Sequence, residues 1–150
     1  ELLGMKVLYA EHRNATTCRE GYTPFEEVLK QADILTLHCA LTETTKNLIN
    51  QETLSLCKKG AYLINTGRGP LIDEQAVCDA LKSGQLGGAA LDVLVKEPPE
   101  KNNLLIELAK TMPNLIITPH IAWASDSAVT TLTKKVTQNI EDFVQQLNQK

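Results

Sequence analysis

The chain has 150 residues, a net charge of -3 and 43% hydrophobic residues, as expected for one globular domain. It has no cluster of Lys and Arg that could bind the phosphates of a nucleic acid. No apolar run approaches the roughly 20 residues that span a bilayer, and the first residues do not resemble a signal peptide. We therefore expect a cytoplasmic protein with neither a nucleic-acid nor a membrane partner.

The cysteines favour reduced thiols over disulfides or zinc ligands. They are widely spaced, contain no CxxC pair and do not combine with a histidine at ligand spacing. No metal site is expected. The cysteines are Cys18, Cys39, Cys57 and Cys78.

The first elements alternate between strand and helix. Residues 1–4 resemble the end of a helix that stops at a glycine, and residues 6–10 form an apolar run, predicted to be a strand that ends at Glu11. Residues 23–26 resemble a capping box with proline at the first helical position, and residues 34–38 predict a second strand. The apolar face of the intervening helix would contain Phe25, Val28, Leu29 and Ala32.

The same alternation continues through the middle of the chain. Asn50 can cap a helix that runs to Lys58, and residues 61–64 form a short apolar run typical of a buried strand. Asp73 can cap the next helix and Gly84 can end it.

Residues 89–93 predict the fourth strand, 104–109 a weaker helix, and 115–118 the fifth strand. Ser125 or Asp126 can cap a long final helix, which we expect to pack on the sheet. Its apolar stripe has helical spacing and consists of Val129, Leu132, Val136, Ile140, Phe143 and Leu147.

This alternation predicts an α/β fold. Strands that are apolar throughout and separated by helices are typical of a doubly wound parallel sheet that is covered on both faces. The crossovers in such a sheet are right-handed in nearly all cases.

Polar side chains follow the carboxyl ends of the predicted strands, where open parallel sheets bind ligands. Arg68 lies between two glycines, and a guanidinium can grip a carboxylate by two parallel hydrogen bonds. A histidine beside a carboxylate suits reversible proton transfer to a carbonyl, but a hydride must come from a cofactor. Taken alone, Arg68 could be a solvated loop residue and His120 a hydrogen-bonded structural residue. The set at strand ends is Glu11, His38, Arg68, Asp92 with Glu97, and His120.

Several ordered motifs resemble the D-isomer-specific 2-hydroxyacid dehydrogenases. They are NTGRG at residues 65–69, ALDV at 90–93 followed by Glu97-Pro98, and TPHI at 118–121. Residues 4–7 and 38–42 are also similar to that family, so the resemblance covers essentially the whole chain.

The resemblance implies specific roles for the residues of these motifs. Arg68 corresponds to the arginine that anchors the substrate carboxylate, Glu97 to the carboxylate that orients the histidine, and His120 to the acid/base. The implied cofactor is NAD, and the implied substrate is a small 2-keto or 2-hydroxy acid. The whole protein would be a homodimer.

The cofactor-binding residues implied by the resemblance are Glu11, Thr66, Gly67 and Asp92. Glu11 would accept hydrogen bonds from the adenosine ribose and repel a 2′-phosphate. The basic pair His12-Arg13 that follows could instead tolerate NADP.

The family's first strand, its GxGxxG turn and its substrate domain are not found in the sequence. Residues 1–150 are therefore expected to be a partial dinucleotide-binding domain, a Rossmann-like fragment that alone binds NAD poorly and is inactive. Residues 6–10 could pair directly with 61–64, which gives the flavodoxin-like order 2-1-3-4-5, or another chain could fill the gap. We favour direct pairing.

The leading interpretation is an oxidoreductase fragment that transfers a hydride between NAD(H) and a small 2-keto acid, with hydroxypyruvate or glyoxylate as candidate substrates. A formate dehydrogenase is the alternative reaction within the family. A corepressor of the same fold, which binds protein partners and uses NAD as a ligand, is the alternative from another class.

Overall fold

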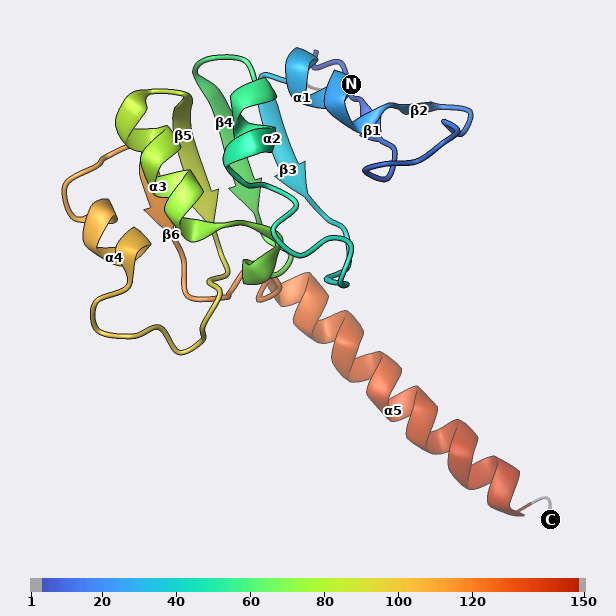
Figure 1. Cartoon of the computed structure of the whole chain (residues 1–150). Helices are drawn as coiled ribbons and strands as arrows, with labels where there is room; N and C mark the ends of the chain where they lie inside the picture. Colours follow the sequence, from blue (N-terminus) through green and yellow to red (C-terminus); the bar gives the residue numbers. More distant parts are fainter. Residues whose placement is uncertain (1–3, 149–150) are drawn as a thin grey trace. The chain divides into compact units, whose positions relative to one another are not determined.

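A computed structural model describes residues 4–148, which belong to two compact units, Glu1–Pro119 and His120–Lys150 (Figure 1). The helix end expected over residues 1–3 lies outside the described residues. The α/β class is confirmed. In chain order the elements are β1 (Tyr9–Ala10), β2 (Tyr22–Thr23), α1 (Phe25–Gln31), β3 (Ile34–Leu37), α2 (Gln51–Leu56), β4 (Ala61–Asn65), the 3-10 helix η1 (Gly69–Leu71), α3 (Glu74–Ser83), β5 (Leu86–Leu91), α4 (Leu104–Ala109), β6 (Leu115–Ile117) and α5 (Asp126–Asn148).

The main sheet of the first unit has four parallel strands in the order β3-β4-β5-β6. Their arrows point the same way in Figure 1, so their carboxyl ends lie at one edge of the sheet. The short strands β1 and β2 pair with each other, in parallel, in a separate sheet.

The predicted order 2-1-3-4-5 is wrong, because β4 pairs with β3 on one side and β5 on the other. Of the strand expected over residues 6–10, only Tyr9–Ala10 is paired, and its partner is Tyr22–Thr23. Two residues carry no readable periodicity, so β2 was missed. In the 3-2-1-4-5-6 order, β1 and β2 of this chain correspond to the second and third strands and β3 corresponds to the fourth. The fourth strand does not lie beside the second in that order, so β3 does not belong beside β1.

The hydrophobic core lies between one face of the main sheet and helices α2, α3 and α4, which Figure 1 shows on the same side of it. Leu35 and Leu63 point into this core, whereas Ile34 and Tyr62, their neighbours along β3 and β4, are 47% and 53% exposed. Side chains along these strands therefore alternate between buried and exposed, and the cover of the second face stays a prediction.

Helix caps show how closely local sequence determines these elements. Asn50 accepts from the backbone amide of Thr53 and caps α2 as expected, although this helix ends at Leu56 instead of Lys58. Asp73 caps α3, and Gly84 ends that helix in the left-handed conformation. The capping box expected for α1 is wrong, because Pro24 is its N-cap and makes no side-chain bond.

Strand β5 begins three residues earlier than predicted, at Leu86, because two glycines concealed its start. A Cβ atom on Gly88 would come within 2.8 Å of the carbonyl oxygen of Asn114, and one on Gly87 would collide with the carbonyl of Gly60. These contacts permit only glycine, so tertiary packing overrides the low strand propensity of the pair.

The second unit consists of a loop and the 23-residue helix α5, which Ser125 caps by accepting from the backbone amide of Ala128. None of the residues in α5 is buried, and the predicted apolar stripe is exposed along the helix. The packing of this stripe on the sheet stays a prediction. None of the helices within residues 4–148 combines the length and the apolar character needed to cross a membrane.

Candidate active site

The four main strands end in a single row. Leu37 pairs with Asn65, Asn65 with Leu91, and Leu91 with Ile117. The residue after each strand is polar, so one edge of the sheet carries four polar residues in a second row. These residues are His38, Thr66, Asp92 and Thr118.

Asp92 is the buried member of this second row and is 5% exposed. Its backbone amide donates to the carbonyl of Asn65 at 2.9 Å, which continues the pairing of β5 with β4. The hydroxyl of Thr118, which follows β6, donates to its carboxylate at 2.5 Å. Two neighbouring strands thus hold one carboxylate at the predicted cofactor edge.

The loop that carries Arg68 is held by Asn65, whose side chain is completely buried. The side-chain oxygen of Asn65 accepts from the backbone amide of Gly67, and its side-chain nitrogen donates to the carbonyl of Arg68, both at 3.0 Å. Arg68 itself is exposed, and its Nη1 donates to the carbonyl of Gly67 at 2.8 Å. The sequence alone indicates no role for Asn65, although an Asx turn that begins at the last residue of a strand is a local signal that could identify it.

The loops after β4 and β5 pack closely together. Any Cβ atom on Gly69 would collide with the backbone carbonyl of Leu94, so residue 69 must be glycine for this contact. The backbone amide of Leu94 donates to Oε1 of Glu97 at 2.9 Å, which holds the predicted positioning carboxylate in the loop after β5. Arg68, Asp92 and Glu97 therefore all belong to connected loops at one edge of the first unit.

Glu74, in the first turn of α3, supports the loop after β5. Its Oε1 accepts from the backbone amide of Val95 at 2.8 Å, and its Oε2 accepts from the side chain of Asn103 at 3.0 Å. The role of Glu74 could not be predicted from the sequence, since a glutamate near a helix start is common and nothing local indicates a partner far along the chain.

His120 is the first residue of the second unit and has a positive φ of 55°. Its side chain is exposed, and its carbonyl accepts from the indole nitrogen of Trp123 at 2.8 Å. The predicted pairing of His120 with Glu97 stays a prediction. His38, the other histidine after a strand, bonds through Nε2 to the hydroxyl of Thr36 at 2.8 Å.

Glu11 lies just past β1, where the adenosine ribose was expected. Its side chain is 4% exposed. Oε1 accepts from the amide of His12 and from Nη2 of Arg19, both at 2.8 Å. Oε2 accepts from the amide of Arg19 at 3.1 Å and from its Nε at 2.8 Å. The hydrogen bonds from Arg19 and from the amide of His12 lower the pKa of Glu11 from 4.5 to about 2.

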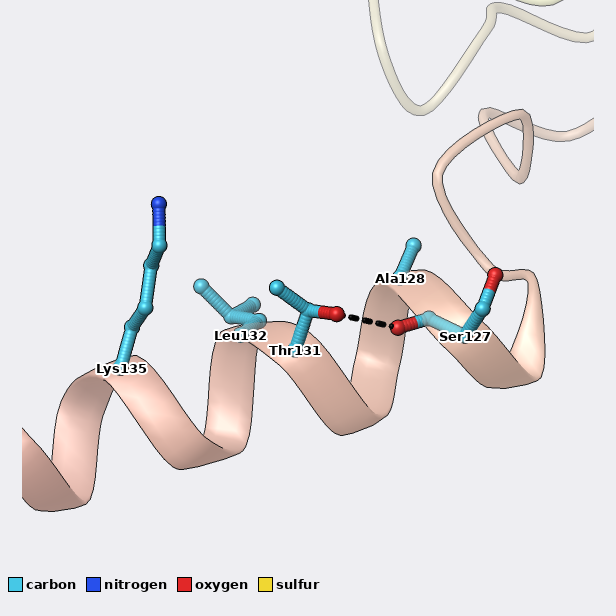
Figure 2. A pocket seen from close by; sticks show the side chains of 5 residues that line it. All are labelled: Ser127, Ala128, Thr131, Leu132 and Lys135. Atoms are coloured by element: carbon cyan, nitrogen blue, oxygen red, sulfur yellow. Dashed lines mark hydrogen bonds between the residues drawn. The ribbon is translucent and has the colours of Figure 1, made fainter.

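Two surface hollows lie elsewhere. One, of about 420 Å³, follows a single face of α5 (Figure 2); because one helix supplies its whole lining, it does not enclose a ligand. The other, of about 390 Å³, lies at the amino ends of β3 and β4, opposite the polar rows. The first is lined by Ser127, Ala128, Thr131, Leu132 and Lys135, and the second by Asp33, Ile34, Lys58, Lys59, Gly60, Ala61 and Tyr62.

Across residues 4–148, no group of three or more His, Cys, Asp or Glu side chains is placed to hold a metal ion. Burial raises the pKa of the Cys57 thiol to about 11, so this thiol stays protonated at neutral pH.

Comparison with known proteins agrees with this fold. Residues 1–122 match the family described as D-isomer specific 2-hydroxyacid dehydrogenase, NAD binding domain. A putative 2-hydroxyacid dehydrogenase from Haemophilus influenzae is 82% identical over 99% of this chain and 47% of that protein. Glycerate dehydrogenase from Methylorubrum extorquens is 46% identical over 96% of this chain and 44% of that protein.

A crystal structure of D-lactate dehydrogenase from Aquifex aeolicus, complexed with NAD and lactic acid, superposes with a TM-score of 0.82 and 33% identity. The match covers 96% of this chain and 47% of that one, so the chain spans about half the length of the relatives it matches. The chain belongs to the D-isomer-specific 2-hydroxyacid dehydrogenase family, and its residues 1–122 match the NAD-binding domain of that family.

Proposed function

We propose that this chain is part of an NAD-dependent oxidoreductase that interconverts small 2-hydroxy acids and 2-keto acids. The observation that carries the proposal is the common row of strand ends, beside which Asn65 fixes the loop of Arg68 and Thr118 holds Asp92. Relatives named glycerate dehydrogenase and hydroxypyruvate reductase support hydroxypyruvate as the substrate, and a similar structure of a glyoxylate reductase supports glyoxylate.

The residues at this edge fit a dinucleotide cofactor. Asp92 offers a buried carboxylate as a hydrogen-bond acceptor for the nicotinamide carboxamide, and Thr66 and Gly67 line the adjacent strand end. We expect Glu11 to lie at the adenosine end of the cofactor. When bound, NAD(H) supplies or accepts the hydride, which no side chain can do.

The remaining chemistry belongs to three side chains. Arg68 grips the substrate carboxylate and polarises the carbonyl that is reduced. His120 donates a proton to the carbonyl oxygen during reduction and removes it during oxidation. Glu97 orients the imidazole for this proton transfer.

His120→Ala tests this assignment in the whole protein. We expect its NADH oxidation rate with hydroxypyruvate to fall by about 10²–10⁴-fold, the usual contribution of a general acid, while NADH binding is retained. His38→Ala is the matched control, because this histidine also follows a strand at the same edge but bonds to Thr36. A rate near that of the wild type in His120→Ala would reject the acid/base role.

The same assay separates the enzyme from a corepressor. A whole protein that binds NADH but reduces no member of a panel of 2-keto acids would contradict the enzymatic proposal. The 150 residues contain no GxGxxG turn to hold the pyrophosphate, so we expect this chain alone to bind NAD weakly and to be inactive.

A further inference from the structure

The loop after β5 is held at both ends by one side chain of α3. Residues 95–103, all of which the structure describes, form neither helix nor strand. Oε1 of Glu74 accepts from the backbone amide of Val95 at 2.8 Å, and Oε2 accepts from the side chain of Asn103 at 3.0 Å. These partners lie 21 and 29 positions further along the chain, so Glu74 closes the loop that carries Glu97.

Two neighbouring backbone amides of this loop each bind a carboxylate. The amide of Leu94 donates to Oε1 of Glu97 at 2.9 Å, and the next amide, that of Val95, donates to Glu74. Only the two backbone dihedral angles of Leu94 separate these amides. The bond to Glu74 therefore also limits the direction in which Leu94 presents its amide to Glu97.

Glu74 is itself attached to the segment that carries Arg68. It follows Arg68 in the chain after η1 and the cap of α3. The intervening Leu71 and Ile72 are completely buried, and the carboxylate of Asp73 caps the helix. Glu74 thus sets the loop after β5 relative to a well-packed segment that begins at Arg68.

A glutamate in the first turn of a helix can also act through its charge alone, which complements the helix dipole. Glu26 in the first turn of α1 is such a residue, and within residues 4–148 its side chain makes no hydrogen bond. A dipole role needs no partner, whereas both oxygens of Glu74 are used by groups of one distant loop. These bonds indicate a role of Glu74 in that loop.

We propose that Glu74 is a positioning residue that acts through Glu97. By fixing the loop after β5, it places the carboxylate that orients His120. The inference rests on the proposed function, which gives Glu97 that role. Asn65 holds the loop of Arg68 separately, so the loss of Glu74 should slow proton transfer and spare the grip on the substrate carboxylate.

The test measures single-turnover NADH oxidation with hydroxypyruvate, which reports the chemical step, in Glu74→Ala of the whole protein. We expect the rate to fall by about 10–100-fold, the effect of a small displacement of a catalytic group, while the KM for hydroxypyruvate stays within about twofold of the wild type. Glu74→Gln keeps one oxygen for the amide of Val95, so it should recover part of the rate. The matched control is Glu26→Gln, which removes a first-turn charge and should leave the rate unchanged.

A double-mutant cycle with Glu97→Gln identifies the group through which Glu74 acts. If this group is Glu97, Glu74→Ala should lower the rate by less than about twofold once Glu97 has been replaced. A second full loss of rate in the double variant would show that Glu74 acts on another group, and it would overturn the inference.

Hydrogen exchange followed by mass spectrometry reports the loop itself. The amides of residues 93–103 should exchange faster in Glu74→Ala than in the wild type or in Glu26→Gln. Asn103→Asp gives a second test if Glu74→Ala fails to fold. An aspartate keeps the cap of α4 but replaces the donor to Glu74 with a carboxylate, so the single-turnover rate should fall in this variant too.

Wild-type single-turnover rates in Glu74→Ala and Asn103→Asp would overturn the inference and leave the dehydrogenase proposal intact. A wild type that oxidises NADH with none of a panel of 2-keto acids would overturn the proposed function, and the inference with it.

Discussion

Glu11 shows how the partners of a single residue determine its titration. Its pKa is lowered from 4.5 to about 2, mainly because Arg19 and two backbone amides donate to the charged form. A lowered pKa in the folded state stabilises the fold above the unfolded pKa. That stabilisation is lost as the pH falls from about 4.5 towards 2.

Because this stabilisation is lost in acid, we expect the stability of the wild type relative to Glu11→Gln to depend on pH. The difference in their free energies of unfolding should be constant above about pH 5 and should shrink as the pH falls towards 2. Urea unfolding at several pH values measures it. A difference that grows on acidification would show that Glu11 is not held ionised by Arg19.

At the scale of elements, the loop after β4 depends on one buried amide. Asn65→Ala removes both bonds that shape residues 67 and 68, so we expect a loss of about 1–3 kcal/mol in the free energy of unfolding. Because the loop carries Arg68, the KM for the 2-keto acid should also rise.

Asn50→Ala is the control that separates a loss of stability from a rise in KM. Asn50 caps α2, and its loss should cost about 0.5–2 kcal/mol while the KM stays unchanged. Urea unfolding and steady-state kinetics on the whole protein measure both quantities. Equal KM values in the two variants would contradict a role of Asn65 in holding Arg68.

The sequence predicts elements well where the signals are local. Asn50, Asp73 and Gly84 mark helix ends that the structure places at those residues. The start of β5 could not be predicted, because its glycines are explained only by backbone atoms distant in the sequence. Likewise, Asn65 and Glu74 act through partners in folded loops, which periodicity does not reveal.

At the scale of the whole molecule, the alternation of strands and helices predicted one edge rich in polar residues, and the sheet confirms that its four strands end together. The strand order could not be predicted because it depended on β2, a strand of two residues. Arg68 and Glu97 lie far apart in the chain, and the parallel pairing of β4 with β5 brings the loops that carry them to the same edge of the sheet.

The steady-state kinetics of Arg68→Gln in the whole protein test the proposed active site most directly, with NADH and hydroxypyruvate as substrates. A bidentate charge-assisted grip on the substrate carboxylate predicts a fall in kcat/KM of about 10²–10⁴-fold, with NADH affinity nearly unchanged. The control is Arg13→Gln, because Arg13 forms an ion pair with Glu52. This variant should leave kcat/KM within about threefold of the wild type. A value of kcat/KM in Arg68→Gln equal to that of the wild type would contradict the assignment of the Arg68 loop to the active site.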